Sequence, residues 1–189
     1  MREADLLLGP REAVSAASLE HVLAARDQRV ALQRTLLRVH GLPVLSLTLV
    51  SPGPVKDSTG RRLLMDMAGS ALSEEVRAAG LTVRQHSRTD GIAGPEALWV
   101  VEASPGRLKR LAMRIEASRP WGRLLDIDVI LAGAGQEPVP LGRQALGCEP
   151  RRCLVCESAA RECIGARRHH PATVIARVAG LIHRFTGQP

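Results

Sequence analysis

Aromatic residues are nearly absent from this chain, which has no tyrosine, one phenylalanine and two tryptophans among 189 residues. Proteins that hold single-stranded nucleic acid usually stack the bases on aromatic side chains. The composition therefore disfavours a nucleic-acid partner, although 26 lysines and arginines against 19 acids give a formal charge of +7. We expect this excess to serve another polyanion, such as a phosphorylated cofactor or an acidic protein.

Long apolar runs are also missing. The longest, at 44–50 and 129–132 with their flanks, are too short to span a bilayer. The first ten residues carry acids and only three consecutive leucines, unlike a secretory signal. We therefore expect a cytoplasmic protein without a membrane partner, in which reducing conditions disfavour disulfides.

The rest of the composition, 45% hydrophobic and 24% charged, is typical of a globular domain. Apolar periodicity predicts a leading helix, a βαββαβ series and a closing helix. The predicted helices cover residues 15 or 18 to 40, 59–79, 105–119 and 172–185, and the predicted strands cover 43–50, 81–86, 97–103 and 124–131. We expect one α+β domain with a mixed sheet flanked by helices. Residues 1–147 would form its core, and 148–189 a small Cys/His-rich segment with the closing helix.

The most informative local feature is a pair of aspartates, Asp126 and Asp128, on the last predicted strand. Strand side chains alternate, so both carboxylates project from one face, about 7 Å apart. Such a pair is repulsive unless it is solvated or shares a cation, and Mg²⁺ typically takes one or two carboxylates plus substrate phosphates. Gly122 and Arg123 just upstream favour a phosphate site, because glycine allows close approach and arginine pairs with phosphate. A solvated strand face is the alternative.

Residues 51–58 follow a strand and precede a helix, a position where α/β proteins commonly bind ligands. Lys56 lies in this segment, and Arg61 follows one helical turn later. Together with the exposed N–H groups of the helix, they suit a polyphosphate. The alternative is a proline-stiffened turn with solvated charges.

All cysteines lie in the last quarter of the chain, and Cys153, Cys156, Cys163 and His169 follow the spacing C-x2-C-x6-C-x5-H. A C-x2-C turn with two further soft ligands can bind Zn²⁺ tetrahedrally. The alternative is a set of packed cysteines beside a basic tail at 167–170.

Three segments in order, 46–58, 119–129 and 150–157, resemble the apo-citrate lyase phosphoribosyl-dephospho-CoA transferase family. The resemblance covers almost the whole chain and includes 24–29 and 94–96. One departure is Arg119, where the family usually has a histidine before the proline. Arginine could replace the phosphate-binding side of a histidine but not its role as a base.

The resemblance implies an enzyme that transfers 2'-(5''-phosphoribosyl)-3'-dephospho-CoA to a serine of the apo acyl-carrier subunit of citrate lyase. The donor would be 2'-(5''-triphosphoribosyl)-3'-dephospho-CoA, and diphosphate would leave. The spacing from Gly122 to Asp126 and Asp128 also looks like the metal-binding element of nucleotidyltransferases, although the usual glycine-serine start is absent. This implies a nucleotidyltransferase-like domain.

In this hypothesis Asp126 and Asp128 hold Mg²⁺, with Glu116 as a candidate third carboxylate. The donor phosphates bind to the basic residues Lys56, Arg61, Arg123 and Arg26. Two alternatives remain open: a non-enzymatic zinc module that binds nucleic acid, and transfer to another carrier such as that of malonate decarboxylase.

Overall fold

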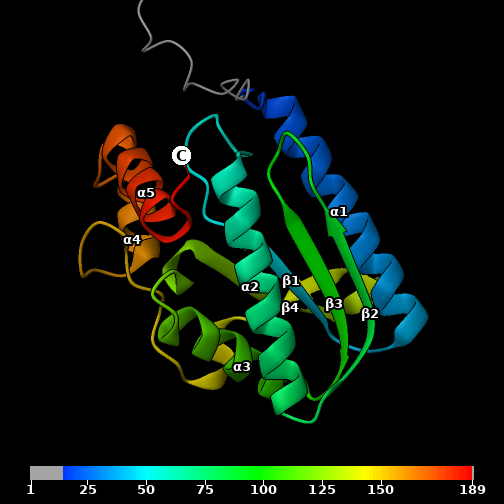
Figure 1. The fold of residues 1–189 in the computed structure, drawn as a ribbon. Coiled ribbons are helices and arrows are strands. Elements are labelled where there is room, and N and C mark those ends of the chain that lie inside the picture. Colours follow the sequence, from blue (N-terminus) through cyan, green and yellow to red (C-terminus); the bar gives the residue numbers. More distant parts are fainter. Residues whose placement is uncertain (1–14, 189) are drawn as a thin grey trace, which may run out of the picture.

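The helices and strands occur in the predicted order, as the computed structural model of residues 15–188 shows (Figure 1). They are α1 (Leu19–His40), β1 (Val44–Leu49), α2 (Thr59–Ala78), β2 (Thr82–Thr89), β3 (Glu96–Glu102), α3 (Pro105–Ser118), β4 (Leu125–Ala132), β5 (Pro138–Pro140), α4 (Ala160–Gly165) and α5 (Pro171–Thr186). The sequence did not reveal β5 and α4, because three and six residues are too few to establish a period. The start of the predicted core, including the ten residues that argued against a secretory signal, lies outside the described residues.

The helix ends follow local capping chemistry. Ser18 caps α1 by accepting a hydrogen bond from the backbone N–H of His21, and Ser58 accepts one from Arg61 at the start of α2. Gly41 ends α1 with a φ of 62°, a left-handed conformation that glycine adopts without a steric penalty. Pro105 stands at the first position of α3, where its missing N–H costs nothing.

The sheet has the strand order β2-β3-β1-β4-β5, and every pairing among the described strands is antiparallel. The predicted α+β class is confirmed, while the sheet is antiparallel instead of mixed. The reason is topological. Helix α2 connects β1 to β2, and α3 connects β3 to β4, and in each case the two connected strands are separated in the sheet by one other strand. The strand between them runs in the opposite direction, which is the split βαβ arrangement.

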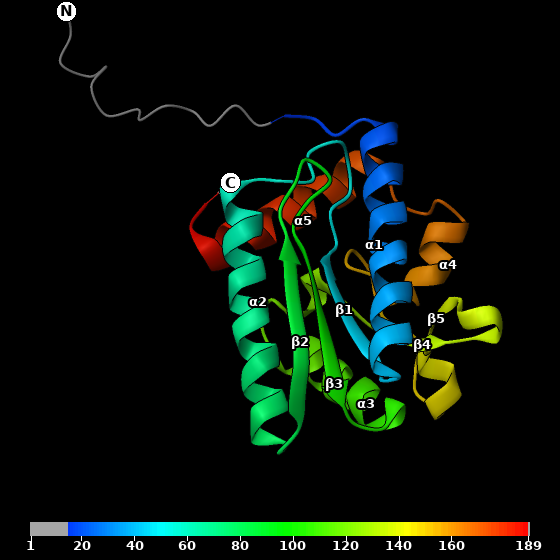
Figure 2. The same cartoon turned by 90° about the vertical axis from the view of Figure 1, so that its right-hand side faces the viewer.

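Helices cover the two faces of the sheet unequally, with α1 on one side and α2 on the other (Figure 2). The main core lies on the α2 face, where α3 and α5 also pack. It includes Leu45 and Leu47 of β1, Trp99 of β3, and Ile182 of α5. The C-terminal helix therefore contributes directly to the main core.

The face under α1 is divided into an apolar and a polar half. Val44 and its cross-strand partners Val100 and Ile130 pack against Leu36 and Leu37 near the end of α1. Further along the same strand face the residues become polar, and Ser46 accepts a hydrogen bond from Gln33 of α1 at 3.2 Å. The polar half contains the predicted aspartates.

No helix within residues 15–188 combines the length and the hydrophobicity that a bilayer crossing requires.

Candidate active site

Asp126 and Asp128 lie on the strand predicted for them and share the face that α1 covers. Their neighbours Leu125 and Ile127 are buried on the opposite face, so the alternation is regular. The side chains of Asp126 and Asp128 are 53% and 43% exposed. Both carboxylates can therefore be reached from solvent, as a metal–phosphate complex would require.

The register of the sheet brings a third acid to the same face. Thr48 of β1 lies opposite Asp126 of β4 on one side and opposite Glu96 of β3 on the other. Since neighbouring strands are about 4.8 Å apart, Glu96 is two strand spacings, or about 10 Å, from Asp126. Glu96 forms an ion pair with Arg29 of α1, which closes this end of the face.

Two cations contact the aspartate pair from the open edge of β4. Lys109 of α3 is buried, and its Nζ lies 3.4 Å from Oδ1 of Asp128 and 3.2 Å from the carbonyl oxygen of Ile127. Arg151 places Nη1 3.5 Å from Oδ1 of Asp126. These contacts hold the two carboxylates in place without enclosing them.

The pKa of Asp126 is raised above its ordinary value, first by burial among protein groups and then by the negative charge of Asp128. Arg151, Lys109 and Arg29 oppose this increase but do not cancel it. Desolvation and repulsion from Asp128 thus together disfavour the ionised form of Asp126. An added divalent cation would relieve that repulsion, so the oxygen donors present suit Mg²⁺.

Glu116 of α3, the candidate third carboxylate, faces the edge of β4. It is buried, its Oε1 accepts a hydrogen bond from the backbone N–H of Ile127 at 3.0 Å, and Arg151 lies 3.2 Å from the same oxygen. Its Oε2 accepts from Arg143. Both oxygens are thus engaged by protein donors, which fits a residue that orders this edge better than it fits a metal ligand.

A pocket of about 190 Å³ opens beside this face, between α1, the end of β1, the 51–56 loop and residues 93–96. Lys56 and Arg26, both predicted to bind phosphate, line it together with Arg29 and Glu96. A backbone hydrogen bond of 2.8 Å from Val50 to Leu124 places the end of β1 next to the start of β4. The pocket and Asp126 therefore lie at the same end of the sheet.

The cations behind the pocket are partly desolvated. Arg61 is buried and donates from Nε to Oγ of Ser51 and from Nη1 to Oγ of Ser58, both at 3.3 Å. Burial lowers the pKa of Arg61, while Asp57 opposes this effect. Burial and the neighbouring charge of Arg61 also lower the pKa of Lys56. A bound anion would stabilise both cations, at the N-terminus of α2 where helix N–H groups also favour negative charge.

Arg123 does not line the pocket and contacts the cysteine segment instead. It stands in the turn just before β4, and its Nη2 donates to the backbone oxygen of Cys153, so its guanidinium rests on the cysteine segment. Lys56 and Arg26 line one pocket at the same end of the sheet as Asp126. Arg61 lies outside the lining but contacts Ser51 of that pocket.

The sequence prediction gave no role in the site to Arg29, Glu96, Lys109 and Arg151. The first two and the last lie in segments 24–29, 94–96 and 150–157, which carried the family resemblance and were the available signal, whereas only the packing of α3 reveals the position of Lys109.

Gly122 allows the turn before β4 to lie against the end of α3. A Cβ at this position would come within 2.5 Å of the carbonyl oxygen of Glu116 and 2.6 Å of that of Ile115. Gly122→Ala should therefore lower the free energy of unfolding by about 1–3 kcal/mol, which is the usual cost of overpacking. Urea denaturation measures this difference.

The control is Gly180→Ala in α5, where a Cβ would meet no described atom within 4 Å. It should be neutral or stabilising by up to about 1 kcal/mol, because alanine favours helix. Equal effects of the two substitutions would show that the contact at Gly122 does not constrain the turn.

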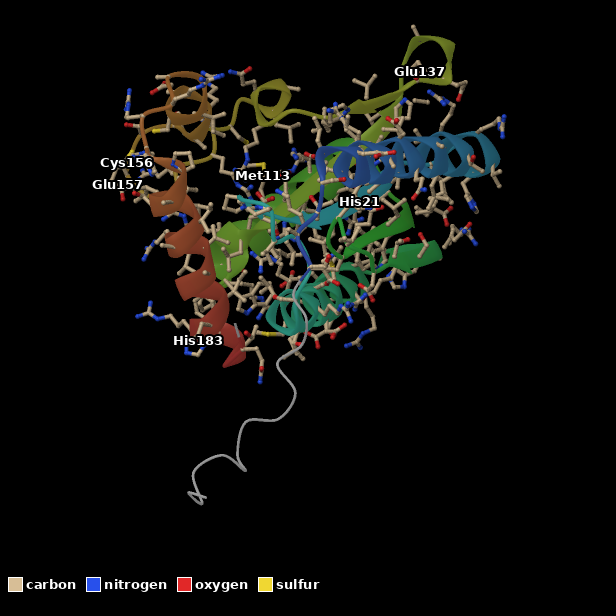
Figure 3. All side chains as sticks on the ribbon, turned by 90° about the horizontal axis from the view of Figure 1, so that it is seen from above. His21, Met113, Glu137, Cys156, Glu157 and His183 are labelled. Atoms are coloured by element: carbon tan, nitrogen blue, oxygen red, sulfur yellow. The ribbon has the colours of Figure 1, made fainter. Side chains whose placement is uncertain are left out.

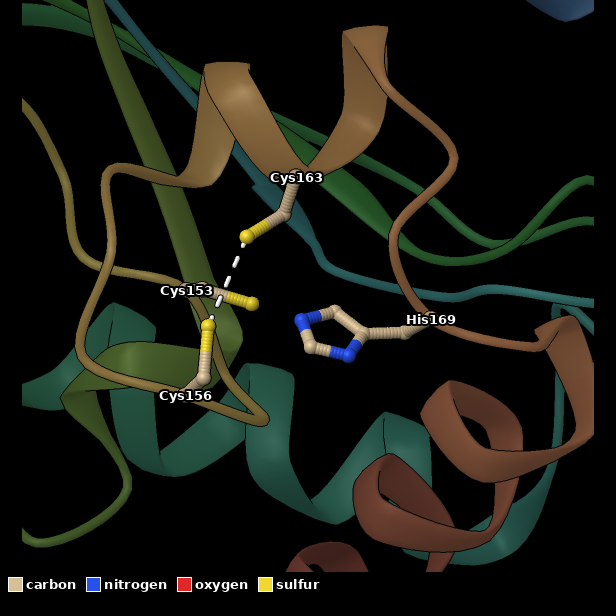
Figure 4. A group of neighbouring side chains, drawn as sticks. All are labelled: Cys153, Cys156, Cys163 and His169. Carbon is tan, nitrogen blue, oxygen red and sulfur yellow. Dashed lines mark hydrogen bonds between the residues drawn. The ribbon is translucent and has the colours of Figure 1, made fainter.

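The predicted zinc ligands converge at the flank of the molecule where α4 meets α5 (Figure 3). One ligand atom from each of Cys153, Cys156, Cys163 and His169 lies within 4.8 Å of the others (Figure 4). The Sγ atoms of Cys156 and Cys163 are 3.5 Å apart. A hydrogen bond from the backbone of Ser158, followed by one from Cys163, lowers the pKa of the Cys156 thiol to about 6.

An α+β domain with paired strand carboxylates beside a cationic pocket is typical of transferases that act on phosphate-linked groups. The chain belongs to the apo-citrate lyase phosphoribosyl-dephospho-CoA transferase family, whose model matches residues 17–185. It is similar to curated transferases of that name from Citrobacter koseri, at 35% identity, and from Shigella boydii serotype 18 and Escherichia coli O157:H7, at 33%. Each comparison covers 168 residues, or 89% of this chain and 90% of the relative. The resemblance seen in the sequence motifs is thus confirmed.

Proposed function

We propose that the protein transfers the 2'-(5''-phosphoribosyl)-3'-dephospho-CoA group from its triphosphate precursor to a serine of the apo acyl-carrier subunit of citrate lyase. Membership of the transferase family supports this reaction. The observation that carries the proposal is the position of Asp126 and Asp128, which face solvent beside a pocket lined by the cations Lys56, Arg26 and Arg29. That combination suits a reaction at a polyphosphate.

In the proposed reaction the serine Oγ of the carrier attacks the α-phosphorus of the donor in line. A new Oγ–P bond forms, and the bond between the α-phosphorus and the oxygen that bridges it to the β-phosphorus breaks. Diphosphate leaves with the electron pair, and the proton of the serine passes to solvent. Asp126 and Asp128 would hold Mg²⁺. When bound, the ion would supply charge neutralisation on the donor phosphates.

Lys56, Arg61 and Arg26 would bind and orient the phosphates. The pocket of about 190 Å³ is smaller than the roughly 300–1,000 Å³ of a site for a drug-sized ligand. It therefore suits the phosphate portion of the donor, with the rest of the molecule lying across the open surface. Fixing the phosphates against the carboxylate pair would align the reacting atoms, which is the main contribution that positioning makes to such transfers.

Arg119 does not act as the base in this proposal. Its Nη2 lies 3.6 Å from Oε1 of Glu75 on α2, and a guanidinium stays protonated in proteins.

The carrier is expected to be an acidic protein, and the exposed arginines of this basic chain offer it a complementary surface.

Intact-mass spectrometry of the carrier tests the proposal. Incubation of the protein with apo carrier, the triphosphate donor and Mg²⁺ should raise the mass of the carrier by that of the transferred group. A carrier with its acceptor serine replaced by alanine should not change.

An unmodified citrate lyase carrier under these conditions would overturn the proposal. The apo carrier of malonate decarboxylase, in parallel, distinguishes the alternative acceptor. Dephospho-CoA offered in place of the triphosphate donor should give no product, because it lacks the triphosphoribosyl group from which diphosphate leaves.

A further inference from the structure

We infer that Cys153, Cys156, Cys163 and His169 form a tetrahedral zinc site that anchors the arginine contacts of β4. In such a site, with Zn–S distances of about 2.3 Å, the ligand atoms lie about 3.8 Å apart. One ligand atom from each of these residues lies within 4.8 Å of the others, so only small rotations are needed to reach that geometry. Three sulfurs and one imidazole nitrogen are an established structural zinc set.

The second observation is the imidazole of His169. Its Nε2 is buried and makes no hydrogen bond of standard geometry within residues 15–188, and the polar group that it faces is the thiol of Cys156 (Figure 4). A buried nitrogen without a hydrogen bond has lost its contact with water and gained nothing in return, which costs free energy and is rare in folded proteins. In Figure 4 the ring points toward the cysteine sulfurs. A metal ion among the sulfurs would give this nitrogen the partner that it lacks.

The surrounding backbone also points to a metal. The N–H of Val155 donates to Sγ of Cys153 at 3.4 Å, and the N–H of Arg168 donates to the carbonyl oxygen of Cys163 at 2.9 Å. The cysteines thus sit on a tight turn and on α4, and His169 lies next to His170, the N-cap of α5. Helix α4 has only six residues, and Ile164 within it is 76% exposed. A short helix without apolar cover needs another source of stability, and a structural metal supplies it.

The site is connected to β4 through the same turn. Arg123 donates to the backbone oxygen of Cys153, and Arg151, two residues earlier, donates to that of Leu125 and forms ion pairs with Glu116 and Asp126. Zinc would therefore fix the backbone that carries Arg151. The metal site stands on its own geometry, and only its effect on transfer rests on the proposed function.

Metal analysis of untagged full-length protein is the first test. We expect about one zinc per chain, and cobalt substitution should produce the ligand-field and charge-transfer bands of a tetrahedral thiolate site. Less than about a tenth of an equivalent of zinc, both as purified and after incubation with zinc under reducing conditions, would overturn the inference. A disulfide between Cys156 and Cys163 in protein purified under reducing conditions would overturn it as well.

Matched variants locate the site. Cys163→Ser and His169→Gln should lose zinc, whereas Cys148→Ser and His183→Gln should retain it, since His183 lies at the other end of α5 (Figure 3). Zinc retained by both cluster variants, or lost equally by the controls, would refute the assignment. The cobalt spectrum of the unaltered protein decides the matter even if a cluster variant fails to fold.

A zinc-selective chelator, with Mg²⁺ in excess, tests the positioning role. It should lower the rate of carrier modification at least several-fold and leave product formation detectable, and added zinc should restore the rate. An unchanged rate in protein shown to have lost its zinc would overturn the positioning role. Absence of any transfer before chelation would instead count against the proposed function, while leaving the metal analysis valid.

Discussion

Replacing Asp126 or Asp128 with asparagine is expected to abolish transfer to the carrier while the fold remains intact. Asparagine keeps the size of the side chain but removes the negative charge that would hold the cation. The cation would stabilise the transition state by several kcal/mol, and losing that stabilisation corresponds to a fall in kcat/KM of about 10³-fold or more. Asp126 is about half exposed, so Asp126→Asn should change stability by less than about 0.5 kcal/mol. Asp128→Asn also removes the negative partner of the buried Lys109 and should cost about 1–3 kcal/mol, which leaves the fold in place.

The rate of carrier modification as a function of Mg²⁺ concentration measures this effect. The matched control is Asp66→Asn on α2, because Asp66 is similarly exposed and also forms an ion pair with an arginine, Arg88. That variant should transfer normally. Near-normal transfer by both Asp126→Asn and Asp128→Asn would exclude the carboxylate pair as the metal site.

Replacing Glu116 with alanine should destabilise the protein by about 2–4 kcal/mol. Removing one partner of a buried ion pair costs about 3–5 kcal/mol. We reduce this figure because Arg143 and Arg151 are about a quarter exposed and can regain water. The substitution also leaves the N–H of Ile127 without its acceptor, and Glu116→Gln should cost less because an amide oxygen can still accept that hydrogen bond.

Urea denaturation of the two Glu116 variants measures the difference. Glu157→Ala is the control, because Glu157 forms an ion pair with Arg152 in which both side chains are more than 70% exposed. Exposed pairs of this kind contribute about 0–1 kcal/mol. If Glu116→Ala were no less stable than Glu157→Ala, the edge of β4 would not depend on this carboxylate.

The sequence predicted those parts of the site that depend on local periodicity. Alternation along one strand was enough to place Asp126 and Asp128 on a common face, and the spacing of Cys153, Cys156 and Cys163 was enough to identify candidate ligands. Of the two predicted starts for the first helix, at 15 or 18, the structure selects Ser18 as the cap, and the helix predicted from 105 begins at Pro105. These signals act within about a dozen residues, so a single sequence contains them.

The remaining features depend on which segments meet. Glu96 joins the aspartate face only because β3 and β4 both pair with β1, and Lys109 reaches Asp128 only because α3 packs beside β4. The antiparallel sheet has the same origin, since the order of helices and strands along the chain leaves their neighbours undetermined. Arg123 shows the same limit: its position suggested phosphate, while packing directs it to the oxygen of Cys153.

The arrangement at the edge of β4 also bears on self-association. An exposed strand edge offers unpaired N–H and C=O groups to which another molecule can add a strand. Here the N–H of Ile127 is bound by Glu116, its carbonyl oxygen by Lys109, and the carbonyl oxygen of Leu125 by Arg151. Side chains take the place of a neighbouring strand on this segment, so the groups that hold the proposed catalytic carboxylates also protect the sheet from intermolecular extension and aggregation.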